Sequence, residues 1–314
     1  AHLHEILLAA GIPGEACVFL PGDGEVGAAL VRHAGVRLIA FTGSRAVGME
    51  IVRTTAATPA SDGGLKRVVC EMGGKNPLIV DTDADRDEAI LAVLESAFGY
   101  QGQKCSAASR LIVVGDAEPF LRRLADATLA LRIGPPEDPK NAVGPLIEAS
   151  AVERLREACA EARRDGRTIL EYEAPPDGYF VAPAIYADLP PDHRVAREEL
   201  FGPLLCAFSV DTLEHAIELA NRTEYGLTAG VFSRSPAHLA LARRELRAGN
   251  VDLNRGTTGA FVGRQPFGGV KLSGAGWKAG GPDYLKQFLE SRTLTENTLR
   301  HGFVPDLPQG GAGA

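Results

Sequence analysis

The stretch VRLIAFTGSRAVGMEIVRTT, residues 36–55, decides the fold class. Its first six residues form an apolar run typical of a buried strand, and Gly43 then permits a tight turn. Ser44 is a favourable N-cap, so we expect a helix that continues to about Thr55. A second apolar run at 66–71 predicts the next strand. A strand, a helix and a strand in this order predict a parallel, doubly wound α/β sheet with right-handed crossovers.

The alternation of strand and helix continues on both sides of this stretch. Further strands are expected at 16–20, 77–80, 111–114, 180–186, 204–208, 228–232 and 249–253. Helices are expected at 2–10, 25–33, 85–98, 118–131, 149–164, 213–221 and 236–247. Residues 255–283 are rich in glycine and lack periodicity, which predicts a long loop that is either functional or disordered. Residues 291–298 alternate and predict a terminal strand, and 307–314 predict a frayed tail.

The composition excludes several classes of protein. The 314 residues include 33 Lys and Arg against 40 Asp and Glu, a net charge of −7, which argues against nucleic acid or an anionic membrane as the main partner. No run of about 18 apolar residues is present, so no membrane-spanning helix is expected. Five cysteines without a CxxC pair or metal-ligand spacing favour a reducing, intracellular setting and predict no metal site. Ala1 stands where a helix is already under way, so we expect the chain to be the C-terminal portion of a longer protein.

Two glycine-containing turns are candidates for binding phosphate. GDGEVG at 22–27 matches G-x-G-x-x-G formally, but Val47 stands about where the acidic partner of that motif belongs, which favours an ordinary glycine-rich turn. FTGSRAVG at 41–48 places Gly43 and Ser44 between a strand and a helix, where free N–H groups and the helix dipole attract phosphate. An ordinary N-cap explains Ser44 equally well.

One cysteine has surroundings unlike those of the others. Four cysteines lie in apolar or helical stretches and are expected to be small core residues: Cys17, Cys70, Cys159 and Cys206. Cys105, in GYQGQKCSAASR at 99–110, lies among small and polar residues, where backbone N–H groups can stabilise a thiolate. Glu71, in EMGGKNP at 71–77, ends a predicted strand and can serve as a base for that thiol. A structural cysteine and a surface glutamate before a turn remain the alternative interpretations.

Five motifs, taken together and in order, resemble the aldehyde dehydrogenase superfamily: FTGSRAVG, EMGGK, GQKC, EELFGP and QPFGGVKLSG. The resemblance extends from about residue 3 to residue 297. It implies an α/β fold in which residues 1–72 are the C-terminal part of a Rossmann-like, NAD-binding domain and 73–289 an α/β catalytic domain. Residues 290–314 would then supply an oligomerisation strand and a disordered tail.

The resemblance also implies roles for individual residues. Cys105 matches the nucleophile that forms a thiohemiacetal and then a thioester, and Glu71 matches the base that activates the hydrolytic water. The matching cofactor-binding residues are Gly43, Ser44, Met72, Gly73, Glu199 and Phe201. A thiolate is a strong nucleophile near neutral pH, and a partly buried carboxylate with a raised pKa is a suitable base, so these roles agree with the chemistry of the side chains.

Within the superfamily, GQKCSAASR, NRGTTGAFVGRQPFGG and GWKAGGPDYLKQF are most similar to the Δ1-pyrroline-5-carboxylate dehydrogenase sub-family. That similarity implies oxidation of L-glutamate 5-semialdehyde to L-glutamate in proline degradation, with NAD as cofactor and NADP left open. Ser106 and the amides of Gly280 and Gly281 would anchor the substrate carboxylate, and Phe288 would line the aliphatic part. It further implies a homo-oligomer, a fusion or association with proline dehydrogenase, and a cytoplasmic or, in a eukaryote, mitochondrial matrix location.

Three other functions stay open at this point. The first is an aldehyde dehydrogenase that oxidises a different aldehyde. The second is a thiol acyltransferase or hydrolase that uses Cys105 without a cofactor. A non-catalytic interaction module is the third, because family members carry further residues before position 1, including the first cofactor-binding strands and the Asn of the oxyanion hole. We therefore expect this polypeptide, expressed alone, to be poorly active or unstable.

Overall fold

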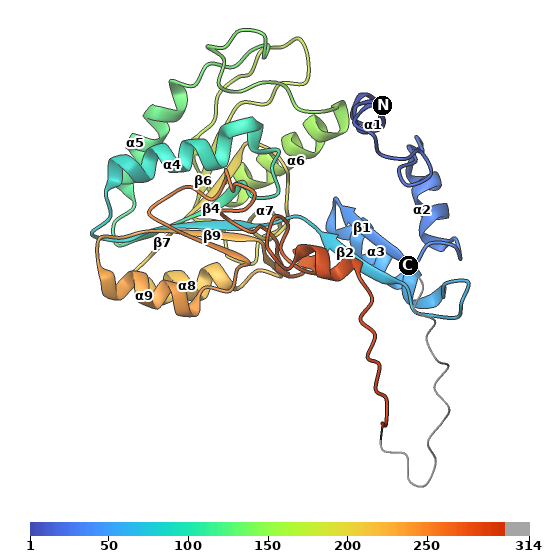
Figure 1. Ribbon diagram of the computed structural model, residues 1–314. Helices are drawn as coiled ribbons and strands as arrows, with labels where there is room; N and C mark the ends of the chain where they lie inside the picture. The colour runs from blue at the N-terminus through green and yellow to red at the C-terminus, as the bar shows by residue number, and fades with distance from the viewer. Residues whose placement is uncertain (299–314) are drawn as a thin grey trace, which may run out of the picture.

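The computed structural model describes residues 1–298, and its largest element is a seven-stranded sheet in the order β10-β9-β3-β4-β7-β6-β5 (Figure 1). Its strands are β3 (Asn76–Val80), β4 (Ala108–Val114), β5 (Arg167–Leu170), β6 (Ala184–Ala187), β7 (Leu204–Val210), β9 (Thr228–Phe232) and β10 (Asn250–Leu253). Neighbouring strands pair in parallel except for β5, which is antiparallel to β6 at the edge. This is the mostly parallel α/β sheet that the sequence predicts.

Helices cover both faces of this sheet. α4 (Arg86–Phe98) and α5 (Glu118–Leu129) lie on one face, and α8 (Leu213–Asn221) and α9 (Pro236–Glu245) lie on the other (Figure 1). Side chains alternate along β3, so Leu78 and Val80 pack with α4 and α5, while Ile79 packs with α8 and with α6 (Ala149–Asp165). Burial on both faces explains why β3 and β4 are continuous apolar runs.

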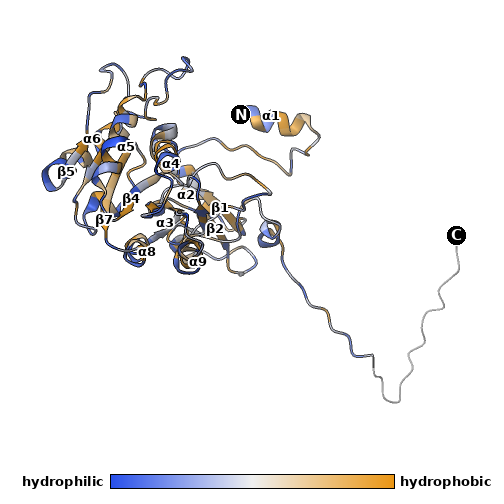
Figure 2. Ribbon diagram, turned by 90° about the vertical axis from the view of Figure 1, so that its left-hand side faces the viewer, coloured by the Kyte–Doolittle hydropathy of each residue, from blue (hydrophilic) through white to orange (hydrophobic). Residues whose placement is uncertain are grey.

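A second, smaller sheet precedes the large one in sequence. β1 (Leu38–Thr42) and β2 (Arg67–Glu71) pair in parallel, and β12 (Gly274–Ala275) adds to β2 in antiparallel orientation. The remaining elements are α1 (His2–Ala9), α2 (Gly24–Arg32), α3 (Arg45–Ala57), α7 (Arg194–Arg197), the 3₁₀ turns η1 (Gly99–Gly102) and η2 (Tyr284–Phe288), and the pair β8 (Tyr225–Gly226) with β11 (Val270–Lys271). Figure 2 shows α1 standing away from both sheets.

Most of the predicted helices and strands are confirmed within two or three residues. Ser44 caps α3 as expected, because its Oγ accepts the Val47 N–H at 3.3 Å. The GDGEVG turn forms the start of α2, where Asp23 Oδ1 accepts the N–H groups of Glu25 and Val26. This is the ordinary turn that the sequence favoured for the motif.

One predicted strand is wrong. Residues 16–20 form no strand, and Val18, Phe19 and Leu20 are exposed. A strand needs a neighbour to share its hydrogen bonds, and in the described part of the chain this run meets none. Residues 291–298 are not part of a strand in this single chain, and a strand that they form with another subunit stays a prediction. The predicted frayed tail at 307–314 lies outside the described residues.

Other differences concern the long loop, the strand before α7 and one cysteine. The predicted loop at 255–283 contains β11 and β12, and the expected strand at 180–186 is shorter and shifted to β6. Cys70, Cys159 and Cys206 are buried as expected, whereas Cys17 is only partly buried because its run is not a core strand. No helix within residues 1–298 is long and apolar enough to cross a membrane.

Candidate active site

An open pocket of about 1040 Å³ lies where the carboxyl end of the small sheet meets the amino end of the large one. Glu71 ends β2, whereas Cys105 precedes β4, so the two side chains reach the pocket from different sheets. The pocket lining includes nine of the residues that the sequence singled out: Gly43, Ser44, Glu71, Met72, Gly73, Cys105, Ser106, Glu199 and Phe201. Residues from motifs far apart in the chain therefore share one cavity.

The Cys105 thiol is half-buried in the turn between η1 and β4. Burial raises the pKa of this thiol, the Glu199 and Glu71 carboxylates raise it further, and backbone N–H groups of Ser106 and Cys105 oppose the rise. The thiol is therefore protonated near neutral pH, and a base that takes its proton would be needed to make it a nucleophile.

The turn that carries Cys105 rests directly on the segment that carries Glu199 and Phe201. Gly102 adopts φ +65°, and a Cβ there would lie 2.4 Å from the Gly202 carbonyl oxygen. Only glycine allows both this backbone conformation and this contact. Gly102 of GQKC thus contacts Gly202 of EELFGP. Each motif alone is weak evidence for a site, and the fold brings the two together.

Glu71 is the second titratable group of the pocket. Burial raises the pKa of its carboxyl to about 7, against a backbone hydrogen bond from Gly269 and the charge of Lys278. The Glu71 carbonyl accepts the Gly43 N–H at 3.0 Å, and the Oε2 atom is buried without a hydrogen-bond partner among the described residues. A carboxyl with this pKa and a free oxygen can accept a proton near neutral pH.

Glu199 approaches the glycines that follow Glu71. Its Oε1 accepts the Gly74 N–H at 3.0 Å, and a Cβ at Gly73 would lie 1.7 Å from Oε2, so any other residue at position 73 would displace the carboxylate. Burial raises the pKa of Glu199, while the Gly74 hydrogen bond and the Lys75 charge oppose it. Beside it, Phe201 has φ +54°, a conformation that costs energy in a residue with a bulky side chain.

Gly43 and Ser44 bring the start of α3 to the pocket. The first N–H groups of a helix lack partners within the helix, and the helix dipole makes this end attractive to anions. The pocket thus combines an anion-favouring helix start with a carboxylate that can accept hydroxyl hydrogen bonds. Its volume and these groups suit a ligand that carries both phosphate and hydroxyl groups.

Three predicted residues do not line this pocket. Gly281 donates its N–H to the Lys278 carbonyl at 3.1 Å, so this amide is already engaged in a turn. Gly280 adopts φ +72° and packs on Val262, although its neighbour Ala279 does line the pocket. The Phe288 ring packs edge-on against Tyr284 with 5.3 Å between ring centroids.

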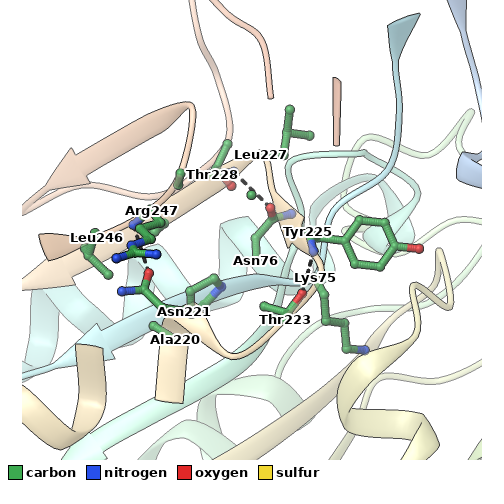
Figure 3. Close-up of a pocket in the computed structure, with 14 residues that line it drawn as sticks. Lys75, Asn76, Ala220, Asn221, Thr223, Tyr225, Leu227, Thr228, Leu246 and Arg247 are labelled. Atoms are coloured by element: carbon green, nitrogen blue, oxygen red, sulfur yellow. Dashed lines mark hydrogen bonds between the residues drawn. The ribbon is translucent and has the colours of Figure 1, made fainter. Parts of the chain in front are cut away.

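Asn76 is the principal residue that the sequence analysis missed. Its Nδ2 donates to the carbonyls of Cys105 and Ala107, both at 2.8 Å, and its Oδ1 accepts the Thr228 N–H at 3.0 Å. Figure 3 shows the Asn76 side chain directed toward Thr228, with this last bond dashed. The sequence holds no local signal for this role, because burial of Asn76 and its contact with Thr228 appear only in the fold.

Charged side chains also reach the pocket without having been predicted. Arg154 of α6 and Lys104 line it, and the Arg154 charge opposes the rise in the pKa of the Glu199 carboxyl. Within residues 1–298, no group of three or more His, Cys, Asp or Glu side chains could hold a metal ion. The pocket lining supplies a thiol, two carboxyls and two positively charged side chains.

Comparisons with known proteins agree on one family. Residues 1–294 match the model described as "Aldehyde dehydrogenase family". The chain is 43% identical over 295 residues to the 1-pyrroline-5-carboxylate dehydrogenase of Geobacillus sp. (strain WCH70) and 41% identical to that of Bacillus subtilis (strain 168). Each alignment covers 93% of this chain and 57% of the relative, so the chain spans little more than half the length of these relatives.

Solved structures show the same similarity in three dimensions. Proline utilization A (PutA) from Bdellovibrio bacteriovorus, inactivated by N-propargylglycine, matches with a TM-score of 0.91 and 46% identity over 97% of this chain and 32% of that one. A 1-pyrroline-5-carboxylate dehydrogenase from Thermus with bound NAD matches with a TM-score of 0.89 and 44% identity, over 92% of this chain and 56% of that one.

Proposed function

The chain belongs to the aldehyde dehydrogenase family, and on this premise we propose that the protein oxidises L-glutamate 5-semialdehyde, the open form of Δ1-pyrroline-5-carboxylate, to L-glutamate with NAD. The relatives named 1-pyrroline-5-carboxylate dehydrogenase and the PutA structures support the choice of substrate. The observation that carries the proposal is the meeting of Cys105, Glu71 and Glu199 in one pocket.

Cys105 and Glu71 perform the proposed chemistry. Cys105 Sγ, once deprotonated, attacks the aldehyde carbon and forms a thiohemiacetal. When bound, the dinucleotide supplies the acceptor for the hydride that leaves this carbon, and a thioester remains on Cys105. Glu71 takes a proton from a water molecule, the resulting hydroxide attacks the thioester, and L-glutamate leaves with the Cys105 thiolate restored.

The pKa values of the two groups suit this division of labour. The Glu71 carboxyl, with a pKa of about 7, is partly ionised at neutral pH and can take a proton and return it to solvent within one cycle. The raised pKa of Cys105 keeps the resting thiol neutral, so its activation is coupled to a nearby base rather than permanent. The Cys105 backbone N–H would donate to the oxyanion of both tetrahedral intermediates.

The remaining proposed residues bind rather than react. Gly43 and Ser44 would hold the pyrophosphate of the cofactor, Glu199 the nicotinamide ribose, and Met72, Gly73 and Phe201 would flank the nicotinamide. Ser106 and the amides of Gly280 and Gly281 would anchor the substrate carboxylate, with Phe288 beside the aliphatic part. For Gly281 this requires its N–H to leave the Lys278 carbonyl when substrate binds.

We extend the proposal to the organisation of the protein. Residues 1–72 would belong to the cofactor domain, 73–289 to the catalytic domain, and 290–314 to a segment that packs on another subunit of a homo-oligomer. The PutA similarity supports a fusion or association with proline dehydrogenase, and the bacterial relatives support a cytoplasmic location.

The decisive experiment replaces the nucleophile. Cys105→Ala is expected to abolish oxidation of the semialdehyde while NAD still binds, because the thiol forms the covalent bond and the cofactor is held by other residues. Cys159→Ala is the matched control, since Cys159 is buried in α6 away from the pocket. Turnover by Cys105→Ala at the wild-type rate, followed as NADH absorbance, would refute the assignment.

A second candidate function keeps the enzyme class and changes the aldehyde. It is favoured by one observation: neither Gly280 nor Gly281 lines the pocket. Comparing kcat/KM for L-glutamate 5-semialdehyde and for a simple aliphatic aldehyde separates the two, because an anchor left unpaired forfeits its binding energy. Equal values would favour the second candidate.

A further inference from the structure

The ammonium group of Lys278 is enclosed by oxygen atoms close to Glu71. Its Nζ donates to the Gly249 carbonyl, to the Gly268 carbonyl at 2.8 Å and to Asn250 Oδ1 at 3.3 Å. An ammonium has three N–H donors, so these three acceptors, which we call the Lys278 cage, use all of them. Lys278 therefore has no donor left for the Glu71 carboxylate.

Gly268 forms the common wall between the Lys278 cage and Glu71. A Cβ at Gly268 would lie 2.8 Å from Glu71 Oε1 and 3.4 Å from Lys278 Cα. The absence of a side chain at this position lets the carboxylate and the lysine approach the same backbone from two sides. The two groups are thus neighbours without a direct hydrogen bond.

The electrostatic effects agree with this geometry. Burial lowers the pKa of Lys278 and the Glu71 charge opposes this, while the Lys278 charge opposes the rise in the pKa of Glu71. The other titratable groups that face Glu71 are the thiols of Cys70 on β2 and Cys105 before β4. Both thiols have raised pKa values and are neutral near pH 7, so Lys278 is the charged group that acts on Glu71 within the described residues.

We propose that Lys278 is a positioning residue for Glu71: the caged ammonium of Lys278 acts through space to keep part of the Glu71 carboxyl ionised near neutral pH, and it leaves Oε2 free to accept a proton. The proposal rests on the proposed function, which makes Glu71 the base. A direct hydrogen bond would stabilise the carboxylate more strongly and weaken it as a base, whereas burial without a nearby cation would keep it protonated. The caged ammonium of Lys278 stabilises the ionised carboxylate to a degree between these two extremes.

The test follows the ionisation of Glu71 itself. In the chain labelled with ¹³C at the glutamate carboxyl carbons, the resonance absent from Glu71→Gln belongs to Glu71, and its shift with pH gives the titration midpoint. Lys278→Met is expected to raise this midpoint by about one pH unit, because a nearby opposite charge is lost. Lys278→Arg keeps the charge and is expected to stay close to the wild type.

Lys271→Met is the matched control. The Lys271 ammonium donates to the carbonyls of Asn221 at 2.9 Å and Thr223 at 3.1 Å, and Glu71 is not among the groups that shift its pKa. This variant also loses backbone contacts of an ammonium, but it should leave the Glu71 midpoint unchanged. If the Glu71 midpoint rises equally in Lys278→Met and Lys271→Met, the proposal is overturned. The rise would then come from the loss of any ammonium that holds the loop and not from the charge of Lys278.

Two further measurements keep the test independent of folding and of the proposed reaction. Lys278→Gln keeps an N–H donor for the Lys278 cage without charge, and it replaces Lys278→Met should that variant fail to fold. A midpoint equal to that of the wild type in the neutral, folded variant overturns the proposal.

In steady-state assays, the neutral variant should move the kcat–pH profile to higher pH with KM unchanged. Full hydrolytic activity of Glu71→Gln would instead refute the role of Glu71 as the base. The titration of Glu71 does not test that role, so the two proposals can fail separately.

Discussion

Asn76 shows how a single side chain can organise the candidate site. Its three hydrogen bonds reach two carbonyls in the Cys105 turn and one N–H at the start of β9, so one buried amide joins three segments. Lys278 acts in a comparable way through its three oxygen partners. In both cases a polar residue fixes the surroundings of a side chain that we propose to be reactive.

Replacing Asn76 should therefore destabilise the fold and loosen the thiol. Asn76→Ala leaves the Thr228 N–H and two carbonyls without their partner, at a cost of about 1–3 kcal/mol for each buried group left unsatisfied. Urea unfolding measures this loss, and alkylation of Cys105 by iodoacetamide measures the change at the thiol. Asn141→Ala is the control, because Asn141 donates one bond to the Pro135 carbonyl in a surface loop. Equal stability of the two variants would contradict this account of Asn76.

Residues that belong to local motifs could be predicted, and those that act through distant partners could not. Cys105, Glu71 and Ser44 stand out because glycines and small residues surround them in the sequence. Asn76 and Lys278 depend on partners such as Thr228 and Gly249. The sequence separation of these contacts hides them from any local pattern, which explains why both residues were missed.

At the scale of elements, local capping signals account for the helices that were predicted well. Ser44, Thr212 and Ser235 each accept an N–H from the third residue of the helix that follows. Strands are different because pairing decides them. The exposed run at 16–20 has the right composition but no neighbour, while the two-residue strand β12 forms because β2 offers an open edge.

The caps of α3 and α9 provide a matched pair of variants. Ser44 and Ser235 each accept one helix N–H at 3.3 Å, so Ser44→Ala and Ser235→Ala should each cost about 1 kcal/mol of stability. Ser44 lines the candidate pocket and Ser235 does not. NAD affinity, measured by calorimetry, should fall about two- to tenfold in Ser44→Ala alone, the value of one hydrogen bond. Equal affinities of both variants would remove Ser44 from the cofactor site.

At the scale of the whole molecule, the centre of the large sheet is much more buried than the edge of the small one. Every residue of β3 is buried, whereas β1 has none that is fully buried. None of the residues of α1, all within the described range, is buried, and α2 buries Val31. The apolar core of the described chain thus belongs to the seven-stranded sheet and its helices.

Hydrogen exchange should reveal this difference directly. In the isolated chain, amides of α1, α2 and β1 are expected to exchange by local opening at low free energy, well before those of β3, β4 and β7, because little apolar surface is lost when they open. Peptide-resolved deuterium uptake measured by mass spectrometry would show this order. Uptake in α1 as slow as that in β3 would contradict the burial pattern.

The division of the pocket between two sheets has a mechanical consequence. Glu71 is carried by one sheet and Cys105 by the other, and residues 72–75 connect them. A second connection spans the same gap, because β11 pairs with β8 and β12, two residues later, pairs with β2. Ser273 between them accepts the Gly226 N–H with its hydroxyl and the Met72 N–H with its carbonyl. The distance between carboxylate and sulfur is thus fixed by two crossings of the chain rather than by one, so a change at Ser273 would alter the spacing of two side chains that it does not touch.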